Sequence, residues 1–337
     1  MSVLHAKENH QYKVVVLCRL FGRSKQAYYK RDDNLVFRDS AMESFAIDYV
    51  RSVRAKAPGI GICKLWHMYR RDFEGNSPLG RDRFYGIMDR EGMKLRKKRR
   101  KPRTTDSRHG LPTYPDLRED FMPSGVNQLW VSDITYIEMW TGAYSSVFCY
   151  LSLVMDAYSM EIIGYSVGPT LETSYPLEAL RMAFAHSSGE VPAGLIHHSD
   201  RGVQYASREY VGLLESHGVK VSMTQSGNPK DNAQAERVNG TMKNELLKGY
   251  RFKDIGQVRE AVGKSVEFYN NDRPHMSVDM MTPAQAAKCT GEINKRWRSY
   301  RLEAIKTSRG NPETGKDAVT LPGVQGFPSR LRLSVNP

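Results

Sequence analysis

The chain has 337 residues, with 50 Lys and Arg against 37 Asp and Glu, which gives a formal net charge of +13. A basic chain of this length predicts a polyanionic partner and has room for roughly two or three domains. Its four cysteines form no CxxC pair, which argues against a zinc site or a disulfide framework. No stretch approaches the roughly 18 apolar residues of a membrane helix, and the polar N-terminus lacks a signal-peptide core. We therefore expect a cytoplasmic protein that does not contact membranes.

Residues 1–93 are predicted to form a helical region. Apolar side chains recur at i, i+3, i+4 and i+7 over 42–53, and shorter stripes follow at 62–69 and 84–88. Before them, residues 16–21 and 26–29 flank Gly22 as a helix–turn–helix would. Two interpretations stay open for this region: docking in a DNA groove, or a small helical bundle without a DNA contact.

Residues 94–127 are predicted to form a basic linker. Eight of the ten residues from 94 to 103 are Lys or Arg, including Lys97, Lys98, Arg99 and Arg100. The segment that follows contains several Pro and Gly residues, a composition that resists compact packing. The basic run is either a solvated, mobile segment or a clamp on DNA phosphates, and a contact of the second kind would be sensitive to salt.

Residues 128–290 change to an α/β pattern. Strands are expected at 129–139, 145–155, 162–167, 195–198 and 219–223, and helices at 177–184, 205–214, 231–249 and 256–271. Thr141-Gly142 predicts a hairpin between the first two strands, and crossover connections follow later. Residues 291–337 are expected to be a partly disordered C-terminal extension, because the chain beyond about residue 303 is rich in Gly, Pro and Ser.

Three carboxylates in the α/β region suit a metal site. Asp133 lies inside the first expected strand, Asp200 ends a short apolar run, and Glu236 lies early in a helix. Cleavage of a phosphodiester needs an activated oxygen and charge neutralisation, which two divalent ions about 4 Å apart supply together. Without metal, clustered carboxylates repel one another and raise one another's pKa.

The helix of Glu236 carries further candidates. At 3.6 residues per turn, Glu236, Asn239 and Lys243 share one face, which predicts metal at one end and DNA phosphate at the other. Asn232 lies one turn earlier and is expected near the same site. Asp231 is a helix N-cap or a further ligand.

Other polar residues are interpreted as structural. Asp156 is expected in a turn, Glu138 on a strand surface, and His197 and His198 in packing or hydrogen bonding beside Asp200. Arg273 and His275 either contact DNA or hold the last helix in place, and the sequence does not separate these roles.

Four ordered motifs resemble the insertion-sequence transposases whose product is often encoded by two overlapping frames and which are related to retroviral integrases. The motifs are Trp130-x-x-Asp133-Ile-Thr-Tyr, His198-Ser-Asp200-x-Gly-x-Gln-Tyr205, Gly227-x-Pro-x-Asp-Asn-Ala-x-x-Glu236 with Lys243, and Tyr269-Asn-x-x-Arg-Pro-His275. The thirty-five residues 201–235 separate Asp200 from Glu236. A true retroviral-type integrase would carry an N-terminal His/Cys zinc module, and the spacing of His and Cys in this chain does not fit one.

The resemblance implies an RNase H-like core that uses Mg²⁺ or Mn²⁺ for strand cleavage and strand transfer. Asp133, Asp200 and Glu236 would hold two ions, and Asn239, Lys243, Arg273 and the basic run at 97–100 would contact DNA. The implied partners are double-stranded DNA (the element's terminal repeats and a target), further copies of the chain, and an upstream-frame helix–turn–helix protein. The implied place is the bacterial nucleoid. The alternative function is a catalytically silent, transposase-derived DNA-binding regulator.

Overall fold

The computed structural model describes residues 13–22, 24–26, 33–74, 79–95, 112–118, 121–142, 145–187, 192–225 and 232–296. Several sequence predictions fall outside these residues. They concern the basic run Lys97, Lys98, Arg99 and Arg100, the second half of the expected helix–turn–helix, Asp231, and the extension beyond residue 296.

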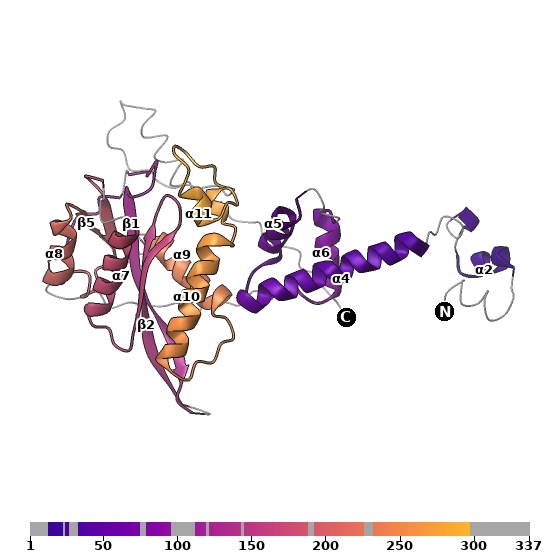
Figure 1. The fold of residues 1–337 in the computed structure, drawn as a ribbon, viewed down its shortest axis with the longest axis horizontal. Coiled ribbons are helices and arrows are strands. Elements are labelled where there is room, and N and C mark those ends of the chain that lie inside the picture. The colour runs from indigo at the N-terminus through magenta and orange to yellow at the C-terminus, as the bar shows by residue number, and fades with distance from the viewer. Residues whose placement is uncertain are drawn as a thin grey trace, which may run out of the picture. The chain divides into compact units, whose positions relative to one another are not determined.

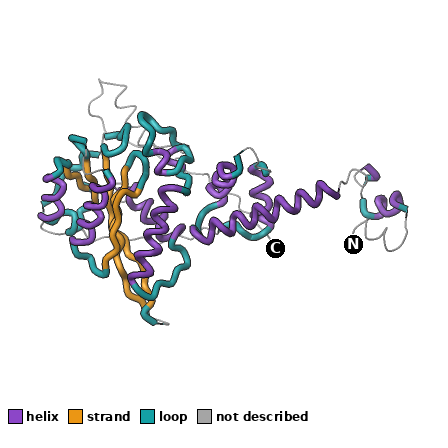
Figure 2. Tube along the Cα trace, in the orientation of Figure 1, coloured by secondary structure: helices purple, strands orange, loops and turns teal. Residues whose placement is uncertain are grey.

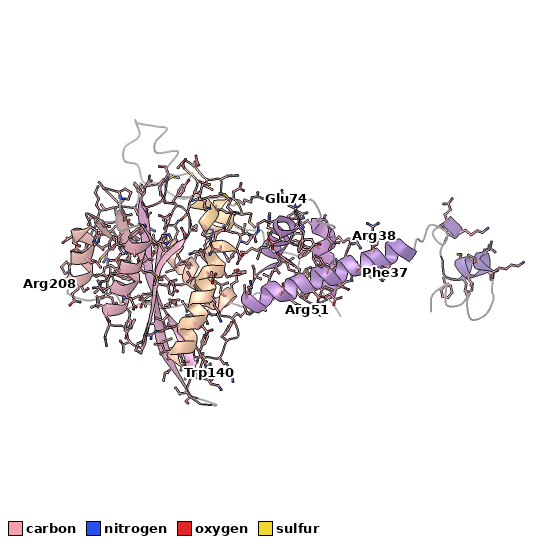
Figure 3. All side chains as sticks on the ribbon, viewed as in Figure 1. Phe37, Arg38, Arg51, Glu74, Trp140 and Arg208 are labelled. Atoms are coloured by element: carbon pink, nitrogen blue, oxygen red, sulfur yellow. The ribbon has the colours of Figure 1, made fainter. Side chains whose placement is uncertain are left out.

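The N-terminal part is helical, as its apolar periodicity predicts. It contains α2 (Val14–Leu20), α4 (Asp33–Lys56), α5 (Ile62–Asp72) and α6 (Arg81–Arg90). The last three pack around Val50, Tyr69 and Phe84, whose side chains are completely buried. Phe37 and Arg38, labelled on α4 in Figure 3, are exposed to solvent.

One mixed sheet forms the centre of the α/β part, drawn in orange in Figure 2. Its strands are β1 (Leu129–Trp140), β2 (Ser146–Asp156), β3 (Ile162–Gly168), β4 (Ile196–Ser199) and β5 (Lys220–Met223), in the order β3-β2-β1-β4-β5. The first three strands pair antiparallel, whereas β4 is parallel to both β1 and β5. This order and these directions are those of the RNase H-like fold that the sequence predicts.

Helices cover both faces of the sheet (Figure 1). The apolar residues of α7 (Ser174–His186) and α8 (Arg208–Ser216) pack in one cluster, and those of α9 (Ala233–Thr241) and α10 (Ile255–Asn271) pack in another. Side chains alternate along β1 accordingly. Trp130 packs on Phe184 of α7, with ring centroids 5.4 Å apart, whereas Ile137 belongs to the cluster of α9 and α10.

The C-terminal elements are short. A π-helix, η2 (Met242–Leu246), follows α9 directly, and the 3₁₀ turn η3 (Met276–Val278) and α11 (Pro283–Ala286) follow α10. Thr282 and Gln285 form a capping box at the start of α11. The sequence predicts a continuous α-helix over 231–249, so the π-helix is a correction to that prediction.

The second half of the predicted linker is attached to the sheet. The backbone N–H of Leu117 donates to Ser222 Oγ at 2.9 Å, and Gln225 Nε2 donates to the carbonyl of Tyr114 at 2.8 Å. Arg118 is buried. The described residues 112–118 therefore follow β5, although their composition predicts a loose segment. Within the described part of the chain, no helix has the length and apolarity needed to span a membrane.

Candidate active site

The sheet register brings Asp133 and Asp200 together. β1 and β4 run parallel, and their last paired positions are Val131 and His198. Each aspartate lies two residues beyond its paired position on its own chain segment. Neighbouring strands are about 4.8 Å apart, so the two carboxylates emerge side by side where β4 ends. A short parallel pairing thus joins residues that are far apart in the sequence.

A tight turn holds the carboxylate of Asp200. Its Oδ1 accepts the backbone N–H of Gly202 at 2.9 Å, and the side chain is partly buried. A Cβ on Gly202 would come within 3.0 Å of the same oxygen, so a side chain there would crowd the carboxylate. Arg201 Nε donates to the carbonyl of Thr224 at 2.6 Å and ties the turn to the end of β5.

Two asparagines fasten α9 to β1. Asn239 Nδ2 donates to Asp133 Oδ2 at 2.8 Å, and Asn232 Nδ2 donates to the carbonyl of Ser132 at 3.0 Å. Both asparagines are buried. Glu236 lies between them, one turn from each, and its own side chain is exposed. The helix therefore presents Glu236 at the margin of the site rather than inside it.

The three acidic side chains influence one another. Burial and then the charge of Asp200 raise the pKa of Asp133 to about 7, and Glu236 adds a smaller upward effect. The hydrogen bonds from Asn239 and from the N–H of Ile134 act in the opposite direction. The site therefore combines oxygen donors with negative charge that its immediate neighbours only partly offset. That chemistry suits a hard divalent cation such as Mg²⁺.

The arrangement of these carboxylates is open. Among the residues that the structure describes, no three His, Cys, Asp or Glu side chains lie close enough together to hold one metal ion. The donor chemistry of the predicted triad fits a divalent ion, and Asp133 and Asp200 are already neighbours. Closing the group requires Glu236 to move inward from its exposed position.

The residues that the sequence predicts at DNA have different surroundings in the structure. Lys243 lies in η2 with its Nζ 3.6 Å from the centre of the Tyr136 ring, at the edge of β1 next to the site. Tyr136 is partly buried. Lys243 reaches the site margin through the π-helix and not through the continuous α-helical face that its spacing predicts.

Asn239 and Arg273, both expected at DNA, have buried contacts within the protein. The side chain of Asn239 is 5 % exposed, and its amide is directed at Asp133. Arg273 is 4 % exposed and binds Glu245 through Nε at 2.7 Å and Nη2 at 3.1 Å. An arginine so placed reaches DNA only by breaking a buried ion pair. The structure thus favours the open alternative in which Arg273 holds the end of α10.

The residues interpreted as structural have structural contacts. Asp156 Oδ1 accepts the backbone N–H groups of Tyr158 and Ser159 at 3.0 and 2.8 Å, which confirms the turn. Glu138 accepts from the hydroxyl of Ser146 at 2.8 Å on the exposed face of the hairpin. His198 Nδ1 pairs with Ser222 Oγ at 2.9 Å.

The hydrogen bonding that the sequence predicts for His197 belongs to a buried network beneath the two aspartates. His197 Nε2 lies 2.7 Å from Ser132 Oγ and 3.0 Å from the hydroxyl of Tyr210, which links β1, β4 and α8. Burial lowers the pKa of His197 to about 3, so the ring is neutral. Tyr205 is also buried, and this burial raises its pKa, with smaller contributions from Tyr210 and from the charges of Asp133 and Asp200.

Family profiles match this part of the chain. One profile described as an integrase core domain matches residues 123–229, and a second with the same description matches residues 217–283. Together they include Asp133, Asp200 and Glu236. With the RNase H-like sheet, these matches define the class as DDE-type polynucleotidyl transferases.

Relatives narrow the class. The chain is 33 % identical to an uncharacterized 31 kDa protein of insertion element IS600 from Shigella sonnei, over 80 % of this chain and 96 % of the relative. It is 32 % identical to the transposase for insertion sequence element IS629 from Shigella sonnei, over 68 % of this chain and 73 % of that protein. The chain belongs to the family of insertion-sequence transposases, which act in DNA transposition.

Solved structures include one similar catalytic domain. The magnesium complex of the HTLV-2 integrase catalytic core domain covers 48 % of this chain and 97 % of its own, with 20 % identity and a TM-score of 0.37.

Proposed function

We propose that the chain binds the ends of its own insertion element, cleaves a DNA strand there and joins the freed 3′ end to target DNA. Asp133, Asp200 and Glu236 are the catalytic and metal-binding residues of this proposal. The observation that carries it is the convergence of Asp133, inside β1, with Asp200, just past the end of the parallel strand β4, beneath a helix that bears Glu236. The expected ions are two Mg²⁺ or Mn²⁺.

The reaction consists of two displacements at phosphorus. In the first, a water oxygen forms a bond to phosphorus, the bond to the 3′ oxygen breaks, and that oxygen leaves as a hydroxyl. In the second, this hydroxyl attacks a target phosphodiester, and the target's own 3′ oxygen leaves. Two ions bound to the carboxylates would activate the attacking oxygen and neutralise charge at the leaving oxygen.

The protein's own contribution is positioning and charge, because such displacements need little covalent chemistry. Asn239 fixes the orientation of the Asp133 carboxylate through its 2.8 Å hydrogen bond. The turn at Gly202 does the same for Asp200. In this proposal Lys243, whose Nζ lies over the Tyr136 ring, attracts a DNA phosphate.

The rest of the chain is assigned to DNA and assembly. In this proposal residues 1–93 bind element ends, residues 94–127 contact phosphates, residues 128–290 form the catalytic core, and residues 291–337 are an extension. The partners are the terminal repeats, target DNA, other copies of the chain and an upstream-frame protein. The net charge of +13 supports a polyanionic partner.

Strand transfer by single variants tests the proposal. Asp200→Asn and Glu236→Gln are each expected to lower the rate on element-end DNA with Mg²⁺ by on the order of 10³-fold, because each removes charge stabilisation from the transition state. Glu138→Gln is the matched control, since Glu138 is an exposed carboxylate on the same strand as Asp133. Glu138→Gln should transfer strands at the wild-type rate.

Wild-type rates in folded Asp200→Asn or Glu236→Gln protein would refute the catalytic assignment. A metal titration separates the alternative function. Retained binding of element ends without any binding of Mg²⁺ or Mn²⁺ would favour the silent regulator, which has no specific observation in its support.

A further inference from the structure

A buried ion cluster joins the helical region to the segment that follows α9. Lys64 of α5 binds Glu245 Oε2 through Nζ at 2.7 Å, and Arg273 binds the same carboxylate from the end of α10. The backbone N–H of Gly59 donates to the carbonyl of Glu245 at 2.7 Å. We call Gly59, Lys64, Glu245 and Arg273 the Glu245 joint.

The joint is enclosed. The side chains of Lys64, Glu245 and Arg273 are 19 %, 13 % and 5 % exposed. Burial lowers the pKa of Lys64, and it also acts to raise the pKa of Glu245, but the charges of Arg273 and Lys64 outweigh that effect and lower it. Buried ion pairs of this kind add little net stability, because desolvation offsets their attraction. Breaking one by removing a partner is costly, because it leaves a buried charge uncompensated.

Gly59 shows how closely the two segments meet. A Cβ on Gly59 would lie 2.4 Å from the carbonyl oxygen of Asn244 and 2.6 Å from the Cα of Glu245. Both are backbone atoms, which cannot turn aside as a flexible side chain does. The turn before α5 therefore packs backbone to backbone against η2. Gly61, two residues later, has no atom within 4 Å of such a Cβ.

The π-helix connects this contact to the active site. η2 (Met242–Leu246) continues α9 (Ala233–Thr241) without a break, and π-helical turns within helices recur at functional sites. Glu245 is thus on the same helical segment as Glu236 and Asn239. Asn232 and Asn239 fasten the N-terminal part of that segment to β1. Lys64 fastens its C-terminal end to α5.

We propose that Gly59 and Lys64 are positioning residues that set α9, and with it Glu236, through the Glu245 joint. The helical region thereby acts on the reaction mechanically as well as through any DNA contact. The reach of the exposed Glu236 side chain towards the two aspartates depends on where α9 lies, and the joint sets that position. The effect on strand transfer rests on the proposed function, whereas the effect on α9 does not.

Hydrogen exchange in the full chain tests the joint without DNA or metal. Gly59→Ala inserts a methyl group into the backbone contact, and Lys64→Met removes one cation while Arg273 still pairs with Glu245. Each is expected to speed amide exchange in residues 233–246 by about tenfold, with exchange in β1 and β2 unchanged. Gly61→Ala and Lys64→Arg are the matched controls and should exchange as the wild type does.

The same variants separate positioning from folding. In strand-transfer assays, Gly59→Ala and Lys64→Met should lower kcat by about tenfold and leave KM for element-end DNA within about twofold. Wild-type exchange in residues 233–246 of both variants would overturn the proposal, as would a loss confined to KM. If the wild type itself shows no strand transfer, the proposed function fails, and the exchange data still decide whether the joint sets α9.

Discussion

Asp133 occupies a position that disfavours its own charge. Its carboxylate is partly buried and faces the charge of Asp200, and these two effects raise its pKa from 3.8 to about 7. One hydrogen bond from Asn239 offsets part of this cost. The ionised form of Asp133 therefore costs the metal-free protein stability, which is the condition that the proposed catalytic role of this residue predicts.

Replacing this carboxylate is expected to stabilise the metal-free protein in a pH-dependent way. Well below pH 3.8, Asp133 is protonated in both the folded and the unfolded chain. As pH rises from about 4 to 7, the unfolded chain loses this proton while the folded chain keeps it, so the folded state loses stability. Above pH 7 the full penalty is present. Asp133→Asn should therefore raise the free energy of unfolding by about 1–3 kcal/mol more at pH 8 than at pH 4, a figure discounted for partial exposure.

Urea unfolding at the two pH values measures this difference. A difference in unfolding free energy between variant and wild type that is the same at both pH values reports the hydrogen bond to Asn239. Only a difference that changes with pH reports the charge of Asp133. Glu138→Gln, an exposed change on the same strand, should show no such change. An Asp133→Asn variant whose offset is equal at pH 4 and pH 8 would show that the carboxylate is not strained.

For single residues, the sequence identifies the candidate site residues more reliably than it identifies their contacts. Asp133 and Asp200 follow from motifs, because a carboxylate inside or just after an apolar strand is chemically conspicuous. Asn239 was expected at DNA because helical spacing shows only which residues share a face. Whether that face meets a ligand or a strand depends on a partner 106 residues away.

Close contacts between backbones set the positions of helices relative to strands. Gly164 of β3 packs under α7, and a Cβ there would lie 2.1 Å from the carbonyl oxygen of Ala179. The contact sets the height of α7 above the sheet, and therefore the cluster that contains Trp130. A glycine at this place is required by close approach rather than by backbone conformation.

Two glycine-to-alanine changes with opposite expected effects on the free energy of unfolding test this arrangement. Gly164→Ala forces α7 away from β3 and should lower the free energy of unfolding by about 1–3 kcal/mol. Gly212→Ala lies in α8, where a Cβ meets no atom within 4 Å, and should raise it by about 0.5–1 kcal/mol through helix propensity. Thermal unfolding of both variants gives the comparison. Equal shifts of the same sign would contradict the role of the close approach.

Periodicity predicts most elements of the sheet and its helices, and its failures have physical causes. The strands from 129 to 223 follow from runs of apolar and β-branched residues bounded by turns. The π-helix at Met242–Leu246 was missed because the pattern assumes 3.6 residues per turn. The attached segment 112–118 was expected to be loose because composition does not show that its backbone bonds to Ser222 of β5 and to Gln225.

At the scale of the whole molecule, one apolar cluster extends from α4, α5 and α6 into the side of the sheet that faces α10. Val50, Phe84, Leu151 and Val258 all belong to it. The sequence does not predict this continuity, because residues of the helical region meet residues that lie far away along the chain. Lys64 and Glu245, for example, form an ion pair across 181 residues. The division into a helical region and a catalytic core remains a prediction about function, and the two share their packing.

Two buried histidines make the fold as a whole sensitive to acid. His197 beneath the aspartates and His275 beside the Glu245 joint are buried, and burial lowers the pKa of each to about 3. Below about pH 6.5 the unfolded chain binds a proton at each ring that the folded chain does not, so stability falls as pH decreases from 6.5 towards 3. Each ring contributes about 1.4 kcal/mol per pH unit in this window.

The wild type is therefore expected to lose several kcal/mol between pH 6.5 and pH 5, less the gain of opposite sign from Asp133. In urea unfolding at both pH values, His197→Gln with His275→Asn should reduce that loss by about half or more. Gln at 197 retains an acceptor for Tyr210, and Asn at 275 retains one for the N–H of Ser277. Exposed His217, changed to Gln, is the control. An unchanged acid loss in the double variant would place the proton uptake elsewhere, and the Glu245 joint would then be the next place to measure.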